Sequence, residues 1–272
     1  MKLSIVLSTH TAQFQAVAFK GDLEANVARI AGWGYDGVEL AIRDPRLVDA
    51  DGLERVVSSH GLSVPAIGTG QAWGEEKLSF TSDDSAVRAA AIARIRSHVP
   101  LAARLQAIVI IGLVRGITPQ GQTHLQSMSY LVAALRECAA SAALVGVRLA
   151  LEPLNRYETD LVHTVAEGLG LVERVGADNL GLLLDTFHMN IEEPVIGESI
   201  RAAGERIFHF HVADSNRWHP GAGHLDFSSI LDTLYAAGYR GFVSGEFMPL
   251  PDAGTAAERS IACLRQITAH EK

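Results

Sequence analysis

The chain alternates short runs of apolar and β-branched residues with longer segments whose apolar residues recur at helical spacing. The short runs are typical of buried strands, and the longer segments are typical of amphipathic helices. The predicted strands are Leu3–Thr9, Gly37–Ile42, Val64–Gly68, Ala107–Val114, Val147–Pro153, Leu180–Asp185, Ile207–Val212 and Gly241–Phe247. The predicted helices are Asp22–Trp33, Leu53–His60, Asp83–Leu105, His124–Leu144, Thr164–Val175, Glu198–Ala203, Phe227–Ala237 and Ala256–Ile267.

This alternation favours a closed barrel over an open sheet. Eight strands, each followed by a helix, are typical of the α/β class and of a single (β/α)8 TIM barrel. An open doubly wound sheet usually carries a glycine-rich phosphate loop after its first strand, and the sequence LSTHTAQF is not one. No low-complexity linker or change of composition interrupts the chain, so we expect one barrel domain over residues 1–272.

Ionisable residues stand at the carboxyl ends of the last four predicted strands. They are Glu152, Asp185, His211 and Glu246. Successive side chains of a strand point to opposite faces, so the period-two pattern turns these four side chains into the barrel mouth. Active sites of such barrels lie at this carboxyl end. We therefore predict that the four side chains meet there.

The seventh predicted strand carries two histidines within the segment FHFHVAD. Strict alternation places Phe208, Phe210 and Val212 outward, against the helices, and His209 and His211 inward. His209 lies one layer deeper than His211. We expect it to be a hydrogen-bonded core histidine rather than a metal ligand.

Three carboxylates and one imidazole cannot share a buried site without compensation. Their negative charges repel one another, and removing each ion from water costs several kcal/mol. A divalent cation that binds Glu152, Asp185, His211 and Glu246 removes both problems. Three oxygen ligands and one nitrogen suit Mn²⁺ or Mg²⁺ better than a structural zinc. We expect a divalent metal, with Mn²⁺ preferred and Mg²⁺ and Co²⁺ as alternatives.

Two carboxylates beside such a metal suggest a reaction. A cation that chelates a ketone oxygen and the neighbouring hydroxyl acidifies the C–H bond between them and stabilises a metal-bound enediolate. One glutamate can remove the proton from one face while the other returns a proton to the opposite face. Glu152 and Glu246 are the candidates for these catalytic roles. The predicted result is an epimerase that inverts the carbon next to a ketone.

Three segments carry a specific resemblance. LEPLNRYETD (151–160), LDTFHMNIEE (184–193) and HFHVADSNRWHPGAGHLDF (209–227) resemble the ketose 3-epimerase group of the xylose-isomerase-like TIM barrel superfamily, which includes D-tagatose and D-psicose 3-epimerases. The resemblance covers nearly the whole chain. It implies the same four metal ligands and the same two proton-exchanging glutamates. It also implies that Glu158, His188 and Arg217 contact the oxygens of the sugar.

Shorter motifs point to one branch of this group. MKLSIVLSTH, AFKGDL, AIRDP, AIGTGQA and VIIGLVRG resemble the 5-keto-L-gluconate epimerase branch, which interconverts 5-keto-L-gluconate and D-tagaturonate in inositol catabolism. The resemblance therefore implies a keto-hexuronate substrate, with neutral ketoses such as tagatose, psicose and fructose as the alternative. A terminal carboxylate favours a bidentate arginine partner. Arg115 is the first candidate for substrate binding and Arg43 the second.

Several of these side chains also have a local explanation. Arg43 could be solvated or paired with Asp44, and Glu158 could be paired with Arg156. Three further residues, His10, Gln71 and Trp73, follow predicted strands and are weaker candidates for lining the pocket.

Charge and cysteine content narrow the class of protein. The 31 acidic residues exceed the 23 basic ones and give a net charge of −8, which argues against a nucleic-acid partner. No apolar stretch is long enough for a membrane span. The apolar run at the start, within MKLSIVLSTH, is too short for a signal-peptide core. Cys138 and Cys263 form no CxxC pair and are expected to be free thiols. We expect a cytoplasmic enzyme with a small keto-sugar or keto-sugar acid as partner, and the resemblance is compatible with a homo-oligomer, either a dimer or a tetramer.

Four other functions would share parts of this pattern. An aldose–ketose isomerase on the same fold typically adds a second metal and a lysine, and the predicted strand ends carry no lysine. A repair endonuclease of the same superfamily needs more histidine ligands and a basic face. A sugar-binding protein has little reason to hold two carboxylates at a metal. A dehydratase or lyase shares the first half of the reaction and stays open.

Overall fold

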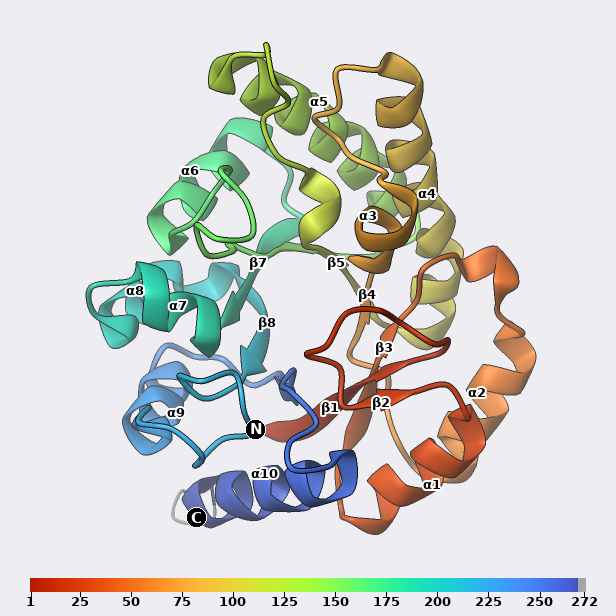
Figure 1. Cartoon of the computed structure of the whole chain (residues 1–272), viewed down its shortest axis with the longest axis vertical. Helices are drawn as coiled ribbons and strands as arrows, with labels where there is room; N and C mark the ends of the chain where they lie inside the picture. Colours follow the sequence, from red (N-terminus) through yellow and green to blue (C-terminus); the bar gives the residue numbers. More distant parts are fainter. Residues whose placement is uncertain (269–272) are drawn as a thin grey trace.

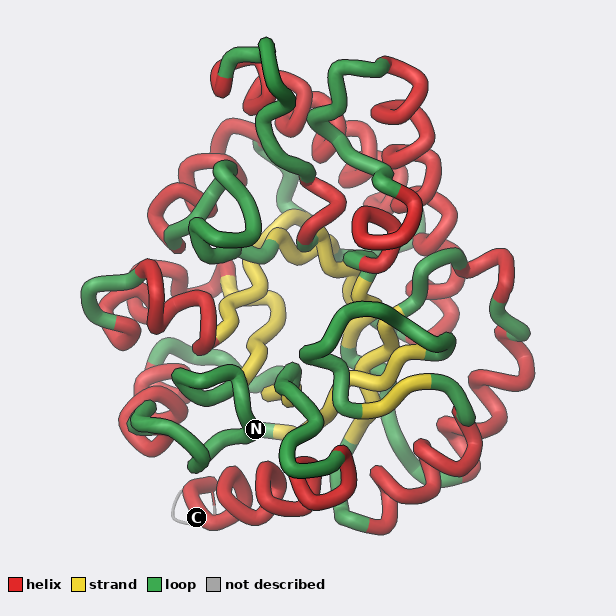
Figure 2. The backbone as a smooth tube through the Cα atoms, viewed as in Figure 1, coloured by secondary structure: helices red, strands yellow, loops and turns green. Residues whose placement is uncertain are grey.

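The computed structural model describes residues 1–268, and within them the strands form a closed ring (Figures 1 and 2). The ring strands are β1 (Lys2–Ser8), β3 (Gly37–Ala41), β4 (Ala66–Gly68), β5 (Ile108–Ile111), β6 (Leu149–Leu151), β7 (Leu180–Asp185), β8 (Ile207–Val212) and β9 (Phe242–Gly245). All neighbours pair in parallel, and β1 pairs with both β3 and β9, which closes the ring. The predicted single (β/α)8 TIM barrel is therefore confirmed. The predicted domain, 1–272, extends over residues 269–272, which lie outside the described part.

Helices surround the ring on its outside (Figure 2). They are α1 (Leu23–Gly32), α2 (Ala50–Ser59), α4 (Ser85–Leu105), α5 (His124–Ala143), α6 (Val165–Val175), α8 (Ile196–Ala203), α9 (Phe227–Ala236) and α10 (Ala253–Thr268). The outward side chains of the strands pack against the apolar faces of these helices and form the main core. Examples are Leu149 and Leu151 of β6, both fully buried.

Short elements lie at the carboxyl ends of the strands, and the apolar pattern did not predict them. They are β2 (Phe19–Lys20), η1 (Pro45–Leu47), α3 (Gln71–Glu76), η2 (Leu113–Arg115) and α7 (Thr186–Glu192), while η3 (Gly204–Arg206) precedes β8. The start of α7 shows how the site and the fold share residues. Asp185 ends β7 and caps α7, because its Oδ1 accepts a hydrogen bond from the amide of Phe187 at 2.7 Å.

The barrel interior is filled below the mouth by a second apolar cluster. It consists of Ala66, Ile108, Ile110, Ala150 and Leu183, with Phe208 packed against it. This cluster forms a floor beneath the mouth.

The position of Phe208 corrects one prediction. The register between β7 and β8 shifts between Leu182 and Leu183, which pair with Ile207 and His209, and Phe208 is the extra residue. An extra residue in one strand breaks strict alternation. Phe208 therefore packs on the interior cluster instead of pointing outward, and the guanidinium of Arg148 lies 4.8 Å from its ring centroid.

Within residues 1–268, no helix is long and apolar enough to cross a membrane.

Candidate metal centre and active site

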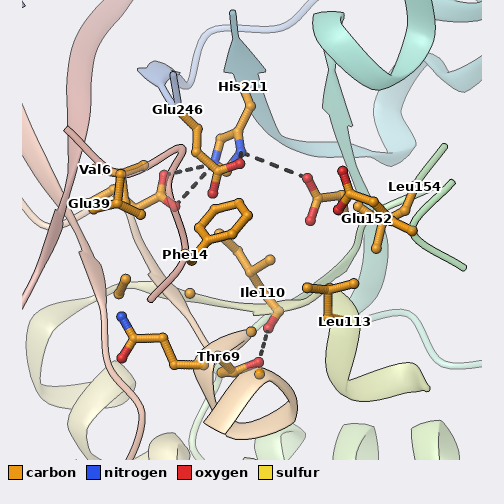
Figure 3. A pocket seen from close by; sticks show the side chains of 18 of the residues that line it. Val6, Phe14, Glu39, Thr69, Ile110, Leu113, Glu152, Leu154, His211 and Glu246 are labelled. Carbon is orange, nitrogen blue, oxygen red and sulfur yellow. Dashed lines mark hydrogen bonds and ion pairs between the residues drawn. The ribbon is translucent and has the colours of Figure 1, made fainter. Parts of the chain in front are cut away.

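The four predicted metal ligands converge at the mouth of the barrel. Glu152 follows β6, Asp185 ends β7, His211 lies in β8 and Glu246 follows β9. One ligand atom from each lies within 4.8 Å of the others. The Nδ1 atom of His211 is 3.9 Å from Glu152 Oε1, 3.9 Å from Asp185 Oδ2 and 3.8 Å from Glu246 Oε2. Figure 3 shows His211 and Glu246 beside Glu152 at one side of the cavity.

The donor atoms of this cluster fit a divalent cation. Glu152 Oε1, Asp185 Oδ2 and His211 Nδ1 are buried and have no hydrogen-bond partner among the described residues. Buried polar atoms are normally paired, so three converging atoms without partners call for a group that binds them all. Carboxylate oxygens with one imidazole are ligands that Mn²⁺ and Mg²⁺ accept.

Glu39 of β3 joins this cluster, although the sequence pattern did not point to it. Its carboxylate is buried and lies 2.7 Å from His209 Nε2 and 3.0 Å from His211 Nε2. A carboxylate accepts hydrogen bonds, so the bond from His211 places a proton on Nε2 and leaves Nδ1 facing the other ligands. Glu39 thus orients His211. His209 makes a hydrogen bond to the same carboxylate, as expected for a core histidine.

Burial and charge shift the pKa values of these groups in the direction that a cation site requires. Burial raises the pKa of Glu152 well above its ordinary value, and the charge of Glu246 raises it further. Burial also raises the pKa of Asp185, and it raises that of Glu246 to about 7. Burial opposes charging of His211, but Glu39, Glu246 and Glu152 outweigh it and raise the pKa of His211 to about 10. The protein therefore binds excess protons at this cluster, and a cation would replace them.

His188, at the start of α7, presents one ring nitrogen to the cavity. Its Nδ1 accepts hydrogen bonds from the backbone amide of Asn155 at 3.3 Å and from its Nδ2 at 2.7 Å. Burial and the charge of Arg217 hold the pKa of His188 well below its usual range, so the ring is neutral and its proton is on Nε2. That Nε2 lies 3.9 Å from Glu152 Oε1 and has no hydrogen-bond partner within residues 1–268.

Arg217 and Glu158 face each other above the cluster. Arg217 Nη1 donates to Glu158 Oε1 at 2.8 Å, and Nη2 lies 3.6 Å from Glu246 Oε2. The guanidinium carbon also lies 5.2 Å from the ring centroid of Phe14 and 4.7 Å from that of Phe187, which fixes its plane. The alternative partner of Glu158, Arg156, instead makes an ion pair with Glu192.

The two arginines expected near a substrate carboxylate lie away from the cavity wall. Arg115 is fully buried, and its guanidinium donates to the carbonyl oxygens of Gly112, Leu161 and Val162. Arg43 makes ion pairs with Glu75 and Glu76, whereas Asp44 pairs with Arg46 and Arg94. In the described part of the chain, neither Arg115 nor Arg43 lines the cavity above the metal ligands.

The cavity has a volume of about 300 Å³, which is the lower end of the range for small-molecule sites. The ionisable residues of its wall are Glu39, Glu75, Glu152, Glu158, His188, His211, Arg217 and Glu246. The remaining wall is largely apolar, with Val6, Phe14, Val17, Ile110 and Leu154 among its residues (Figure 3).

Two of the weaker candidates do not reach the cavity. Of the residues considered, Gln71 lines it, while His10 and Trp73 are not part of its wall as far as the structure is described.

Comparison with known proteins assigns the chain to a family. The family model described as xylose isomerase-like TIM barrel matches residues 27–267. L-ribulose 3-epimerase of Mesorhizobium japonicum is 36% identical over 243 residues, which cover 88% of this chain and 80% of that protein. D-psicose 3-epimerase of Agrobacterium fabrum is 32% identical over 224 residues, 80% of this chain and 76% of that protein. A solved structure of L-ribulose 3-epimerase covers 99% of this chain and 95% of its own, with 30% identity and a TM-score of 0.86.

The protein belongs to the xylose isomerase-like TIM barrel family. The predicted resemblance to ketose 3-epimerases is confirmed by these relatives, and so is the prediction of an enzyme of the epimerase type.

Proposed function

We propose that this protein is a metal-dependent 3-epimerase of neutral ketoses. The observation that carries the proposal is the placement of two glutamates at the ends of one ligand arc. Glu152 follows β6 and Glu246 follows β9, with the ligands of β7 and β8 between them. A substrate held over His211 therefore meets a carboxylate from each of two sides.

Glu152, Asp185, His211 and Glu246 would hold the cation, for which Mn²⁺ is the first choice. When bound, the cation withdraws electron density from the ketone oxygen of a ketose and acidifies the adjacent C–H bond. The protein supplies the bases. One glutamate, in its ionised form, removes the proton, and the other, in its neutral form, returns a proton to the opposite face of the same carbon.

The charges of the two glutamates are coupled in a way that suits this exchange. The negative charge of Glu246 raises the pKa of Glu152, so ionising one carboxyl group favours the neutral form of the other. Each turnover moves one proton onto one glutamate and one proton off the other. The pair is then ready for the reverse reaction, as an epimerase between two stable sugars requires.

Three side chains around the cation are proposed to position the sugar. His188 offers a free Nε2–H donor, and the Arg217 guanidinium and the Glu158 carboxylate offer a donor and an acceptor next to it. Vicinal hydroxyl and carbonyl oxygens of a ketose need such a mixture. These contacts keep the reacting carbon between the two glutamates.

The cavity wall supports a neutral ketose better than the keto-hexuronate implied by the shorter motifs. Among the described residues that line the cavity, Arg217 is the one guanidinium, and it already pairs with Glu158. Arg115 donates to three backbone carbonyls and is proposed to hold the 161–162 segment against η2. Within the described cavity wall, a substrate carboxylate would thus meet only a guanidinium that is already paired with Glu158. The relatives named above also act on uncharged ketoses, according to their names.

Proton NMR in D2O tests the proposal. The Mn²⁺- or Mg²⁺-loaded protein is incubated in parallel with L-ribulose, D-psicose and D-tagaturonate, and a chelator-treated sample serves as control. We expect deuterium at carbon 3 of a neutral ketose together with its 3-epimer, and at least tenfold slower exchange with tagaturonate. Faster exchange with tagaturonate than with the neutral ketoses would favour a keto-hexuronate as the substrate. No exchange with any of the three sugars, in protein that holds metal, would refute the epimerase.

A further inference from the structure

The cavity has a second polar feature, on the side opposite the metal ligands. Gln71 is the first residue of α3, directly after β4, and its side chain lines the cavity although only 7% of the residue is exposed. In the ring of eight strands β4 stands across the mouth from β8, which carries His211. Figure 3 shows Thr69, two residues before Gln71, across the cavity from His211 and Glu246.

Hydrogen bonds determine which way the Gln71 amide points. The hydroxyl of Ser8 donates its one proton to the carbonyl oxygen of His10 at 2.7 Å. Ser8 Oγ can therefore only accept from Gln71, and the Gln71 Nε2 group lies 2.7 Å away as its donor. The amide nitrogen is thus fixed against Ser8, and the carbonyl oxygen Oε1 is turned elsewhere.

That oxygen is buried and lacks a hydrogen-bond partner in the part of the chain that the structure describes. A buried acceptor without a donor is costly, so Oε1 favours a ligand that brings a hydrogen-bond donor. The neighbouring acceptor on the same face of α3 is the carboxylate of Glu75, four residues on, which also lines the cavity. This side of the cavity thus offers hydrogen-bond acceptors, which suit the hydroxyl groups of a sugar.

The helix that carries Gln71 is held in place from behind. Arg94, itself buried, donates to both carboxylate oxygens of Glu76 at 2.8 Å, and its Nη1 also donates to the carbonyl oxygen of Arg43 at 2.8 Å. Arg43 in turn donates to Glu75 Oε2 at 2.6 Å. The acceptors of α3 therefore stand at fixed positions and can discriminate between substrates.

We propose that Gln71 determines specificity for the distal end of the substrate: its Oε1 accepts a hydrogen bond from the terminal hydroxyl of the ketose, on the carbon farthest from the metal ligands. Ser8 is the positioning residue for this contact. The inference rests on the proposed ketose 3-epimerase activity and adds to it a preference for substrates that keep the terminal hydroxyl.

The test compares D-psicose with 6-deoxy-D-psicose, which lacks only that hydroxyl. For the metal-loaded protein we expect kcat/KM to favour D-psicose by about tenfold, the effect of one hydrogen bond to a buried acceptor. In Gln71→Met, which keeps the length of the side chain but removes the acceptor, the ratio should fall to about one. Ser8→Ala, which releases the amide, should give an intermediate ratio. Gln126→Met, the same exchange on the exposed face of α5, is the matched control and should keep the tenfold ratio.

Calorimetric Kd values for both sugars give a second readout that does not depend on turnover. The Kd difference between the two sugars should be largest in the wild type and in Gln126→Met, smaller in Ser8→Ala and absent in Gln71→Met. A preference that persists in Gln71→Met, or a wild-type protein that binds both sugars equally or binds neither, overturns the role of Gln71. Absence of carbon-3 exchange in the wild type, with the Gln71-dependent Kd difference intact, would instead refute the epimerase and leave the distal contact standing.

Discussion

The two sides of the barrel mouth differ in almost every physical property. The ends of β6 to β9 bring together Glu152, Asp185, His211 and Glu246, all buried or nearly so, with donor atoms within 4.8 Å. The ends of β1, β4 and β5 and the segments after them present mostly apolar side chains, together with Gln13, Thr69, Gln71 and Glu75, whose carboxylate is paired with Arg43. On the first side, the charged side, Glu152 Oε1, Asp185 Oδ2 and His211 Nδ1 have no hydrogen-bond partner among residues 1–268; on the second side the same is true of Gln71 Oε1.

The difference shows how such a barrel can separate reaction from selection. In the proposed reaction, Glu152 and Glu246 on the charged side would move protons at a carbon that is the same in every substrate. Gln71 on the opposite side would contact the part of the sugar that varies. Substitutions on the charged side should therefore act on rate and metal binding, and substitutions of Gln71 on the opposite side should act on the choice of substrate.

The largest effect is expected when either glutamate loses its charge. Glu152→Gln or Glu246→Gln should lower the epimerisation kcat by about 10²- to 10⁴-fold, because general acid–base catalysis contributes this much. The rate is measured by NMR at saturating metal, with metal content determined on the same sample. Glu173→Gln on the exposed face of α6 is the control. If a variant keeps its metal and its kcat falls less than tenfold, that glutamate does not take part in the proton exchange.

A weaker effect is expected when the support of His211 is changed. Glu39→Gln keeps the shape of the side chain but removes the charge that orients the imidazole. Loss of such a partner typically weakens metal affinity 10- to 100-fold. Competition with a chelator measures the affinity, and excess metal should restore much of the activity. An unchanged affinity would mean that packing alone orients His211.

The charged side should also respond to pH. In the metal-free protein, Glu246 has a pKa of about 7 and His211 one of about 10, so both hold protons near neutrality that a cation must displace. Metal affinity should therefore rise by at least about tenfold from pH 6 to pH 8. The raised pKa of Glu246 means that its contribution to metal-free stability is present below pH 4.5 and lost as the pH rises through 7.

Calorimetry with chelator competition at several pH values measures this dependence. The increase in Tm that metal produces should grow over the same pH range, because the metal-free protein loses stability while the metal-bound protein does not. An affinity that is flat between pH 6 and pH 8 would show that the cluster is already deprotonated.

The smallest effect on selectivity is expected at Arg115. Arg115→Lys keeps a positive charge but cannot reproduce the hydrogen bonds to the carbonyls of Gly112, Leu161 and Val162. The free energy of unfolding should fall by about 1–3 kcal/mol, the cost of buried acceptors without donors. The ratio of kcat/KM for D-tagaturonate and D-psicose should change less than about twofold. A large loss confined to tagaturonate would assign Arg115 to a substrate carboxylate.

The charged side was largely predictable from the sequence. In a parallel barrel, all strand ends meet at one mouth, so a period-two pattern in each strand is enough to bring Glu152, Asp185, His211 and Glu246 together. No knowledge of contacts between strands is needed for that step.

Glu39 and Phe208 show what such a pattern leaves out. Glu39 lies within a fully buried strand, and its histidine partners are 170 and 172 residues away, so the local sequence gives no partner for it. The sequence signal that could have pointed to Glu39 is a single carboxylate within an otherwise apolar strand. Phe208 points inward because β8 carries an extra residue opposite β7, and this depends on pairing between strands. The amide orientation of Gln71 likewise depends on Ser8, 63 residues before it.

The closure of the ring by β1 and β9 has a consequence for how the protein is made. Of the ring strands, β1 is synthesised first and is the partner that holds β9, the last of them, and Glu246 directly follows β9. A nascent chain that ends after β8 already contains Glu152, Asp185 and His211, but it has an open edge and lacks the fourth ligand. The proposed cation site would therefore reach full affinity only in chains whose translation has passed residue 246.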